Sequence, residues 1–418
     1  MMNSKKNKSV IYLYRLLTFF MVVVLCTLIS NYEIVSGEIG ENTLFSKACC
    51  LMDADTGRVL YSKNGNEVMP MASTTKIMTC ILAIEIGNMD DMVEITSYAA
   101  SMPKVKLGAK EGECYKLEDL LYCMMLESYN DASVAVAEHI AGSVENFAEL
   151  MNAKARDLQC YNTYFITPNG LDATREINGK VYSHSTTAED LCRIMAYCEK
   201  NEKFIEITNQ SSYSFTNQKT DSSHPLRSFT VNNKNAFLNM MDGVTSGKTG
   251  FTNEAGYCYV CSFELDGKRF VVSLLGCGWP NNKTYKWKDA RFLLEYGMNN
   301  YNIKTLNSEM ISTPEILIKN GVLEDKIGDF KIKTSNNNYE NDKLINQFNI
   351  LVSKDDKLYK KIEVEDVIYA PIEENQIVGH IYYYINEDIY YVEELCINYD
   401  IEEYTLEFCI KRVLNEIF

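Results

Sequence analysis

Three short stretches decide the fold class of this chain, and they read Ser73-Thr74-Thr75-Lys76, Ser128-Tyr129-Asn130 and Lys248-Thr249-Gly250. Together they can supply the parts of a serine acyl-transfer site that works without histidine. A serine hydroxyl is a poor nucleophile until a neighbouring base takes its proton. If residues 73–86 form a helix, Ser73 and Lys76 lie one turn apart on the same face. Burial and a second cation such as Lys248 would lower the pKa of Lys76, toward the neutral amine that a base requires.

The surroundings of the first stretch separate it from a chance match. Ser101 and Lys104 have the same spacing, but Pro103 interrupts the turn that would join them. Residues 77–84, in contrast, are apolar, as in a buried helix. We therefore expect Ser73 at a helix N-terminus, where the helix dipole favours negative charge.

Longer stretches around these motifs resemble the serine-type D-Ala-D-Ala carboxypeptidases, which are the low-molecular-mass penicillin-binding proteins. The resemblance rests on residues 52–61, 71–79, 130–143, 167–171, 185–191 and 242–250. It is strong over residues 45–300 and weak beyond them. The resemblance implies that the chain removes the terminal D-Ala from peptidoglycan stem pentapeptides through a serine acyl-enzyme.

The resemblance implies catalytic roles for Ser73, Lys76 and Ser128. Ser73 would attack the carbonyl of the D-Ala-D-Ala bond with Lys76 as its base, and Ser128 would relay a proton toward the leaving amine. The backbone N–H groups of Ser73 and Phe251 would form the oxyanion hole, where donors aimed at developing charge lower the barrier most.

The resemblance also implies a substrate-binding set, made up of Asn130, Lys248, Thr249, Gly250 and Phe251. Asn130 would hold the substrate amide and the catalytic lysine, Lys248 would supply positive potential, and Thr249 would help to bind the terminal carboxylate. The implied partner is a stem peptide ending in D-Ala-D-Ala. Penicillins and other β-lactams would act as covalent inhibitors, because their strained amide mimics the same dipeptide.

Two positions depart from the family pattern. Tyr129 stands where the family usually has a small residue, so its phenol either narrows the cleft or leans away on the loop. We expect the second arrangement. Asn169 stands where many relatives carry histidine.

Alternative functions on the same fold are a D,D-endopeptidase, a β-lactamase and a catalytically silent penicillin-binding sensor. A fast class A β-lactamase needs a dedicated glutamate to activate its deacylating water, and no residue in the sequence can be assigned to that role. The intact Ser73, Lys76 and Lys248 argue against the silent sensor. The carboxypeptidase is therefore the expected activity.

Residues 1–37 have the anatomy of a secretory signal. A basic start precedes an apolar run over residues 16–29, and the small residues Ser36 and Gly37 come after it. We expect cleavage and export, so that the protein works outside the cytoplasm, in the cell wall or on the outer face of the cytoplasmic membrane. The alternative is an uncleaved anchor, because the run approaches spanning length once residues 10–13 are added.

Charge and histidine usage narrow the possible partners. The net charge of −16 argues against nucleic-acid binding, which is driven mainly by neutralisation of phosphates. The four histidines are scattered along the chain at positions 139, 184, 224 and 380. We therefore expect no metal and no cofactor, and we interpret His184 as a loop residue.

Fourteen cysteines are unusual for an exported protein, since an oxidising compartment favours disulfides. Most lie in apolar patterns, so we expect small buried hydrophobic side chains rather than redox chemistry. Cys258 and Cys261 have a redox-like spacing, but in a strand their sulfurs would face opposite sides.

We predict an α+β, penicillin-recognising fold, in which helices flank an antiparallel sheet, for a peptidase domain over residues 38–300. Residues 46–62 predict two strands, and residues 73–200 are mainly helical. Three strands should follow Gly247, the last two joined by the Asp266-Gly267 turn.

Residues 301–400 contain apolar β-rich runs separated by polar stretches, and they resemble the small β-sandwich domain appended to many members of this family. Residues 401–418 predict an amphipathic tail helix with an apolar stripe. The stripe consists of Leu406, Ile410, Val413, Leu414 and Ile417. The N-terminal segment or this tail could contact the membrane surface, or the tail could pack on the β-rich domain. Four glutamates in the tail would be repelled by anionic lipid.

Overall fold

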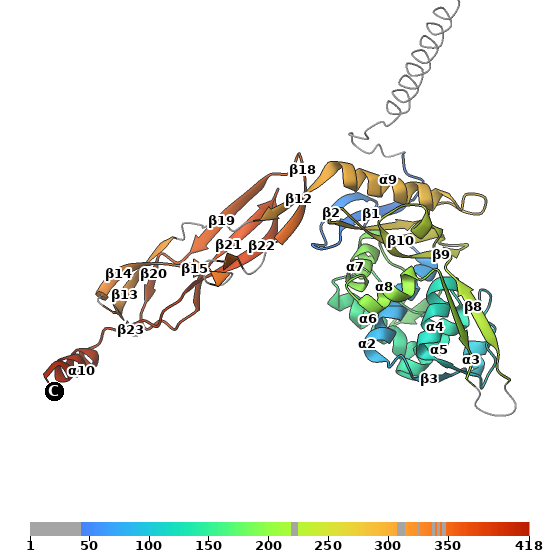
Figure 1. Ribbon diagram of the computed structural model, residues 1–418, viewed down its shortest axis with the longest axis horizontal. Helices are drawn as coiled ribbons and strands as arrows, with labels where there is room; N and C mark the ends of the chain where they lie inside the picture. Colours follow the sequence, from blue (N-terminus) through green and yellow to red (C-terminus); the bar gives the residue numbers. More distant parts are fainter. Residues whose placement is uncertain are drawn as a thin grey trace, which may run out of the picture.

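The computed structural model describes residues 43–218, 225–306, 314–324, 326–336, 339–340, 343–344 and 348–417. The predicted signal segment therefore lies outside the described residues. The described chain forms two regions, an α+β region up to residue 300 and an elongated strand-rich region after it (Figure 1).

A five-stranded antiparallel sheet with the order β2-β1-β11-β10-β9 organises the first region. Its strands are β1 (Ala48–Asp53), β2 (Val59–Lys63), β9 (Val244–Thr252), β10 (Gly256–Leu265) and β11 (Lys268–Leu275). Asp266 and Gly267 join β10 to β11 with φ values of 52° and 75°. A two-residue hairpin turn of this hand needs positive φ at both positions, and this is why an Asp-Gly pair predicts it.

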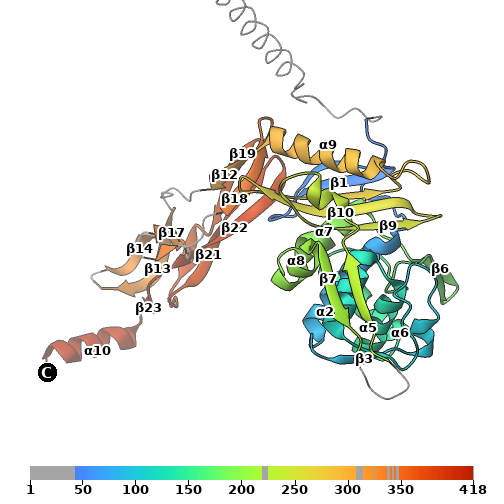
Figure 2. The ribbon, with the colours of Figure 1, turned by 45° about the vertical axis from the view of Figure 1, so that its right-hand side comes forward.

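Helix α9 (Tyr285–Asn300) covers one face of the sheet, and the main helical cluster lies on the other side of it (Figure 2). The cluster comprises α2 (Lys76–Ile86), α3 (Ser97–Ala100), α4 (Leu117–Tyr122), α5 (Asn130–Ala141), α6 (Val144–Asp157), α7 (Ala188–Cys198) and α8 (Glu202–Asn209). Each face of the sheet has its own apolar core. Cys258 belongs to the core on the helical side and Cys261 to the core under α9, as the strand alternation predicts.

Shorter elements surround the helical cluster. They are η1 (Ala72–Thr75), the pair β3 (Met92–Glu94) and β4 (Cys114–Lys116), η2 (Cys123–Glu127), the pair β5 (Thr174–Ile177) and β6 (Lys180–Ser183), the pair β7 (Ser212–Thr216) and β8 (Ser228–Asn232), and η3 (Ala236–Asn239). Twelve of the thirteen cysteines in the described part of the chain are buried, and none of the thirteen forms a disulfide. They therefore serve as small apolar side chains.

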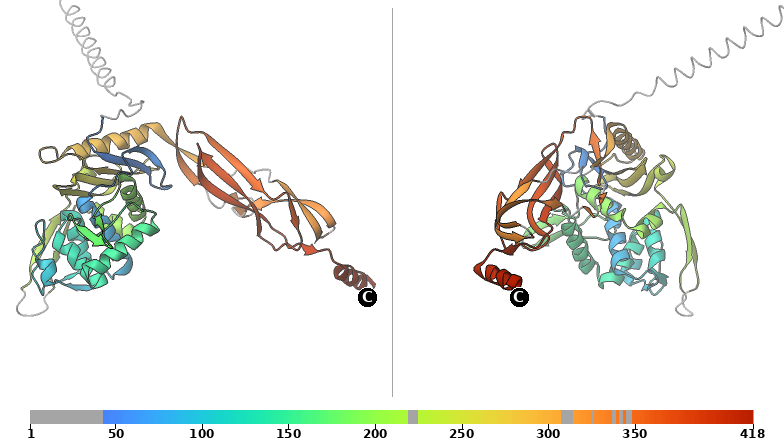
Figure 3. Two further views of the ribbon diagram at one scale, coloured as in Figure 1. Left: turned by 180° about the vertical axis from the view of Figure 1, so that it is seen from behind. Right: turned by 60° about the vertical axis from the view of Figure 1, so that its left-hand side comes forward.

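The strand-rich region extends away from the first region and ends in a helix (Figure 3). Its elements are β12 (Tyr301–Leu306), β13 (Glu315–Leu323), β14 (Lys326–Lys333), β15 (Ser335–Asn336), β16 (Tyr339–Glu340), β17 (Lys343–Leu344), β18 (Phe348–Ser353), β19 (Leu358–Val364), β20 (Val367–Tyr369), β21 (Gln376–Ile385), β22 (Asp388–Ile397), β23 (Glu402–Glu403) and α10 (Leu406–Ile417). A compact apolar core, which includes Ile316, Ile381 and Leu395, lies between its sheets.

The tail differs from the helix predicted over residues 401–418. Glu402 and Glu403 form strand β23 against β13, and α10 begins only at Leu406. The two residues pair their backbone groups with Val322 and Gly321, and this hydrogen bonding competes with helix formation. Within the described ranges, no helix combines the length and apolar character needed to cross a bilayer.

An ion pair joins the two regions. The guanidinium of Arg58, directly before β2, contacts the carboxylate of Asp356 at 2.5 and 3.0 Å and also donates to the carbonyl of Leu351. The hydroxyl of Tyr301 donates to the carbonyl of Leu60 at 2.9 Å. The β1–β2 hairpin therefore contributes to the contact between the two regions, beside the core under α9 that includes Tyr301 and Leu351.

Candidate active site

Ser73 lies at the N-terminal end of a helix, as the sequence suggested, but in a tight turn that leads into the α-helix rather than in the α-helix itself. The turn η1 is a 3-10 helix that precedes α2, and Ala72 at its start has a φ of 49°. A non-glycine residue in this left-handed region is uncommon and is held by its surroundings. The turn places Ser73 beside Lys76, with 3.0 Å between the lysine Nζ and the serine Oγ.

The Lys76 amine has three oxygen neighbours. Besides Ser73 Oγ, they are Asn130 Oδ1 at 3.0 Å and the backbone carbonyl of Asn169 at 2.5 Å. A neutral amine has two N–H donors and one lone pair. If the two carbonyl oxygens accept the N–H groups, the lone pair is left for the hydroxyl proton of Ser73.

Burial and a nearby charge favour this neutral form. Lys76 is fully buried, and desolvation, followed by the charge of Lys248, holds its pKa well below the ordinary value for lysine. Desolvation disfavours an ammonium because the charge loses its hydration, and a like charge adds repulsion. The two effects on which the sequence argument relied therefore act together at this amine.

Ser128 is presented by an unusual backbone. Residues Cys123–Glu127 form a π-helix, and Ser128 follows it with a φ of 66°. Single π turns recur at functional sites because they redirect a side chain. The next helix begins at Asn130, whose backbone N–H donates to the carbonyl of Val105 at 2.8 Å. The π-helix before the second motif and the hydrogen bond of Asn130 at its end therefore fix the backbone of this motif.

The third motif lies on β9, at the edge of the sheet. Lys248 is 2% exposed, and burial lowers its pKa to about 7. Gly250 faces the nucleophile turn so closely that a Cβ built there would lie 2.8 Å from the backbone nitrogen of Ser73. Only glycine permits this approach of strand to turn.

The register of the sheet also orients the N–H of Phe251. Tyr257 on β10 directs both of its backbone groups toward the β11 side, where they bond with Gly278 and Cys277. Phe251 is the partner of Tyr257 across β9 and β10, so the two form a non-hydrogen-bonded pair. The N–H of Phe251 therefore points away from β10, over the open edge of β9.

These elements meet at a cleft of about 320 Å³. Six of the predicted site residues line it, namely Ser73, Ser128, Asn130, Thr249, Gly250 and Phe251. The remaining two, Lys76 and Lys248, are buried next to it. All eight predicted residues, from three distant stretches, thus converge on one place.

Three further lysines line the cleft and were not predicted as site residues: Lys104, Lys234 and Lys286. Lys234 pairs with Glu127 at 3.2 Å. Lys286 lies over the rings of Tyr257 and Trp287, and burial lowers its pKa to about 8. Lys104 belongs only to the rejected Ser101–Lys104 match, and no motif marks Lys234 or Lys286. Loops and a helix far apart in the chain bring the three lysines to the same rim.

The two departures from the family pattern do not obstruct the cleft. Tyr129 is half-buried and packs against the helical core, and it is absent from the residues that line the cleft. The side chain of Asn169 is buried beside Met102, and it contributes to the site through its backbone carbonyl.

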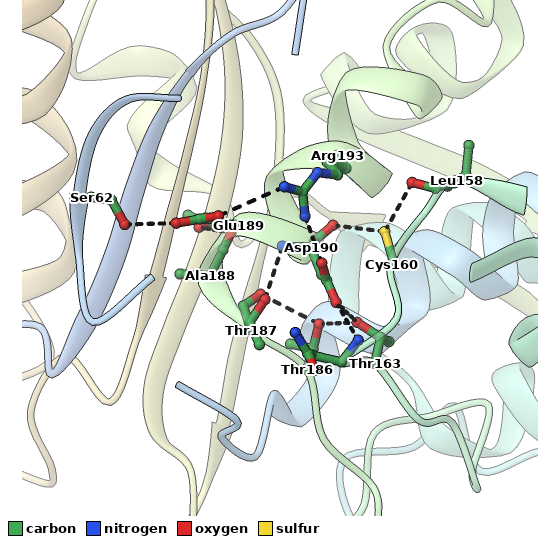
Figure 4. Close-up of polar contacts among 12 residues, drawn as sticks. Ser62, Leu158, Cys160, Thr163, Thr186, Thr187, Ala188, Glu189, Asp190 and Arg193 are labelled. Atoms are coloured by element: carbon green, nitrogen blue, oxygen red, sulfur yellow. Dashed lines mark hydrogen bonds and ion pairs between the residues drawn. The ribbon is translucent and has the colours of Figure 1, made fainter. Parts of the chain in front are cut away.

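The loop that carries Asn169 is anchored at its start by Asp190 on α7. The carboxylate of Asp190 accepts hydrogen bonds from the Thr163 hydroxyl at 2.9 Å and from the Asn162 N–H at 3.1 Å (Figure 4). Arg193 holds the same carboxylate at 2.7 Å. Over the described ranges, no group of three or more His, Cys, Asp or Glu side chains is placed to hold a metal.

Comparisons with known proteins agree with this geometry. The peptidase S11 family, described as D-alanyl-D-alanine carboxypeptidase, matches residues 37–277. D-alanyl-D-alanine carboxypeptidase DacF of Bacillus subtilis is 30% identical over 342 residues, 80% of each chain. A D-alanyl-D-alanine endopeptidase of Pseudomonas aeruginosa is 31% identical over 224 residues, 53% of this chain and 67% of the relative.

The fold has counterparts among solved structures. Penicillin binding protein 5 of Haemophilus influenzae superimposes with a TM-score of 0.66 at 24% identity, over 87% of this chain and 100% of that one. This likeness confirms the predicted penicillin-recognising fold with its added strand-rich region. The family match covers more than half of the chain, and this chain therefore belongs to the peptidase S11 family of D-alanyl-D-alanine carboxypeptidases.

Proposed function

We propose that this protein removes the terminal D-Ala from peptidoglycan stem peptides through an acyl-enzyme on Ser73, and that β-lactams acylate the same serine. The observation that carries the proposal is the contact between Ser73 Oγ and the Nζ of a fully buried lysine, Lys76, at 3.0 Å. A buried amine with a lowered pKa next to a hydroxyl is the arrangement that activates a serine without histidine.

Acylation follows from this contact. Lys76 takes the hydroxyl proton, and Ser73 Oγ bonds to the carbonyl carbon of the penultimate D-Ala. The oxyanion that forms lies between the backbone N–H groups of Ser73 and Phe251, which stabilise its charge. The C–N bond then breaks, and the proton that Lys76 took from Ser73 passes through the hydroxyl of Ser128 to the amine of the departing D-Ala.

Water completes the turnover. It adds to the acyl carbonyl and gives a proton to the neutral amine of Lys76, the ester bond to Ser73 breaks, and Lys76 returns that proton to Ser73 Oγ. The same donors stabilise the second oxyanion, because its oxygen occupies the same place. A penicillin acyl group would leave slowly by this route, and the enzyme would remain blocked.

Lysines in and beside the cleft would bind the carboxylate end of the substrate. Lys248 and Thr249 would bind the terminal carboxylate, with Lys286 adding charge from the rim of the cleft. Asn130 would hold the substrate amide through its amide nitrogen while its oxygen receives Lys76. A cationic cleft in a chain with a net charge of −16 is the local feature that fits an anionic peptide.

The test uses two assays on the full exported chain. A reporter-labelled penicillin should mark the wild type covalently, and Ser73→Ala should abolish the label. Release of D-Ala from a muramyl-type pentapeptide should be lost in the same variant. Labelling that survives Ser73→Ala would reject this serine as the nucleophile, and rapid release of hydrolysed penicillin would favour a β-lactamase.

A D,D-endopeptidase is the second candidate, because a relative with 31% identity carries that name. It would use the same residues on a cross-linked peptide. The rates of hydrolysis of a cross-linked peptide dimer and of a free pentapeptide distinguish the endopeptidase from the carboxypeptidase. We expect the pentapeptide to be the better substrate.

We further propose that residues 1–37 direct export and are removed, which leaves a peptidase domain over residues 38–300 on the outer side of the membrane. Helix α10 presents Leu406, Ile410 and Val413 to solvent, each more than half exposed, and this supports contact with a membrane surface. Flotation with zwitterionic and anionic vesicles tests it. Because of the tail glutamates, we expect the zwitterionic vesicles to bind better.

A further inference from the structure

We propose that His184 is a positioning residue for acylation, because its imidazole joins the loop that carries Asn169 to the turn that carries Ser73. The inference rests on the proposed function of Ser73 and Lys76. His184 lies after β6 and is 3% exposed, so it is a buried structural link and not simply the loop residue that the sequence suggested. It does not line the catalytic cleft.

One side of the ring holds the loop. The backbone N–H groups of Ile166 and Thr167 donate to His184 Nδ1 at 2.9 and 3.3 Å. The hydroxyl of Thr167 in turn accepts the N–H of Gly170 at 3.2 Å. These contacts surround Asn169, whose carbonyl receives the Lys76 amine.

The other side of the ring holds the turn. His184 Nε2 lies 2.8 Å from Thr75 Oγ1, and Thr75 Oγ1 donates to the carbonyl of Ala72 at 2.8 Å. Ala72 is the residue with the left-handed φ of 49°, directly before Ser73. The ring therefore ends a hydrogen-bond chain that supports a strained turn.

The hydrogen bonds determine the state of the ring. Because Nδ1 accepts two N–H groups, it carries no proton, and Nε2–H must donate to Thr75. Burial, followed by the charge of Lys76, lowers the pKa of His184 to about 3, so the ring stays neutral at physiological pH. A neutral imidazole of one tautomer is a fixed connector between the two segments.

The two segments that His184 joins also touch directly. A Cβ built on Gly170 would lie 2.0 Å from the carbonyl oxygen of Ala72. Loop and turn are therefore packed backbone to backbone, and a shift of one moves the other. Both define the place of the Lys76 amine relative to Ser73. A displacement of about 1 Å at a reacting group can cost about a hundredfold in rate.

Two substitutions separate the two sides of the ring. In His184→Asn the amide oxygen can replace Nδ1, which keeps the loop contacts and loses the one with Thr75. In Thr75→Val the hydroxyl is lost from the other end, and Thr75→Ser is the matched control that retains it. Stopped-flow acylation with a reporter penicillin gives the acylation rate constant and the reversible binding constant separately.

We expect His184→Asn and Thr75→Val each to lower the acylation rate constant about tenfold, with reversible binding within about twofold. Thr75→Ser should stay near the wild type. The double variant should be no slower than the single ones, because both break one chain. If His184 had a purely structural role, its variants would have a lower melting temperature, but the acylation rate constant would not fall while reversible binding stayed the same. Additive losses, or none, would overturn the inference.

Hydrogen exchange of the intact protein tests the link without any activity. In His184→Asn and in Thr75→Val, residues 72–76 should exchange faster, while residues 166–167 stay protected. His184→Gln, whose longer amide reaches Thr75 and abandons the Nδ1 position, should expose residues 166–167. Unchanged protection in all three variants would refute the link. If the proposed function itself were wrong, the result would be distinguishable, because the reporter penicillin would not label the wild type.

Discussion

The two regions of the molecule differ in the charged groups that they bury, because only the first buries lysines in the described part of the chain. The first region buries Lys76 and Lys248 almost completely, together with Asp131. In the described part of the strand-rich region, the buried polar residues are Thr334 and Glu393, and the side chain of Asp356 is also largely covered. Burying an ammonium is costly, and a protein retains such a group where the charge has chemistry to perform. The difference agrees with the position of the candidate active site, whose residues all belong to the first region.

The largest effect should come from Lys76→Met, which removes the base and keeps the volume. We expect the acylation rate to fall by about a thousandfold, because general-base catalysis contributes about 10²–10⁴. The measurement is single-turnover labelling with penicillin. A fall of less than tenfold would mean that another group takes the proton, and the contrast between the regions would lose its basis.

A smaller effect on the acylation rate should come from Gly250→Ala. Gly328→Ala in the strand-rich region is the variant with which it is compared. A Cβ on Gly250 would meet backbone atoms of the nucleophile turn, whereas one on Gly328 would meet nothing within 4 Å. We expect Gly250→Ala to slow acylation about tenfold to a hundredfold, because backbone must move.

Gly328→Ala should leave acylation unchanged and only lower stability, by about 1 kcal/mol, because of its φ of 92°. Labelling kinetics and thermal denaturation of both variants separate the two effects. Equal loss of activity in both would show that the regions are not independent.

The buried Lys248 should also make the activity depend on pH. Its pKa of about 7 means that the free enzyme loses this charge as the pH rises through neutrality. We expect kcat/KM for a peptide with a free carboxylate to decline on the alkaline side with an apparent pKa close to 7. Lys248→Arg should keep its charge and lack that limb, whatever its absolute rate.

Stability should follow the opposite trend at the same residue. When the pKa of a lysine is lower in the folded than in the unfolded protein, the lysine does not destabilise the fold above its unfolded pKa. As the pH drops below that value, the lysine lowers the free energy of unfolding more and more, down to its folded pKa. Lys248→Met should therefore stabilise the protein at pH 7, by about 2 kcal/mol, while it weakens substrate binding. Denaturant unfolding at pH 6 and pH 9 would check the sign, because the gain must be larger at pH 6.

The smallest effect on activity should come from the ion pair between the regions. Asp356 is partly buried, and although desolvation alone would raise its pKa, hydrogen bonds from Arg58 and the Ser353 N–H hold it below the ordinary value. Asp356→Asn should loosen the contact and leave acylation within about twofold, since the residue is remote from the cleft.

Small-angle scattering should detect wider motion of the strand-rich region in this variant. The wild type should show the same loosening as acid protonates Asp356, because a carboxylate with a lowered folded pKa loses its contribution as the pH falls through that value. An unchanged scattering profile at acidic pH would remove the ion pair as the link. A large loss of activity would contradict the division of roles.

Local sequence patterns predicted much of the first region. The Asp266-Gly267 hairpin, the helices after residue 76 and the eight candidate residues that meet at the cleft were all identifiable, because each depends on a motif or a turn type. Residues 301–400 were predicted to be β-rich, but the bounds of β13 and β14 were not, and the pairing of these two strands contains a register shift between Ile318 and Gly321. The tail helix was predicted a few residues too long, because the pairing of β23 with β13 is not visible in a local pattern.

Motif order and the family resemblance that it carries thus predicted the fold class, and the motifs predicted Ser73 as the nucleophile and Lys76 as its base. Only the tertiary structure decided that the Asn169 carbonyl receives that lysine, that His184 connects loop and turn, and that Lys104 and Lys286 reach the same cleft. The physical reason is the distance along the sequence over which each effect acts. Turn and helix preferences depend on neighbours within a few residues, whereas desolvation and hydrogen-bond partners depend on segments that meet only when the chain is folded.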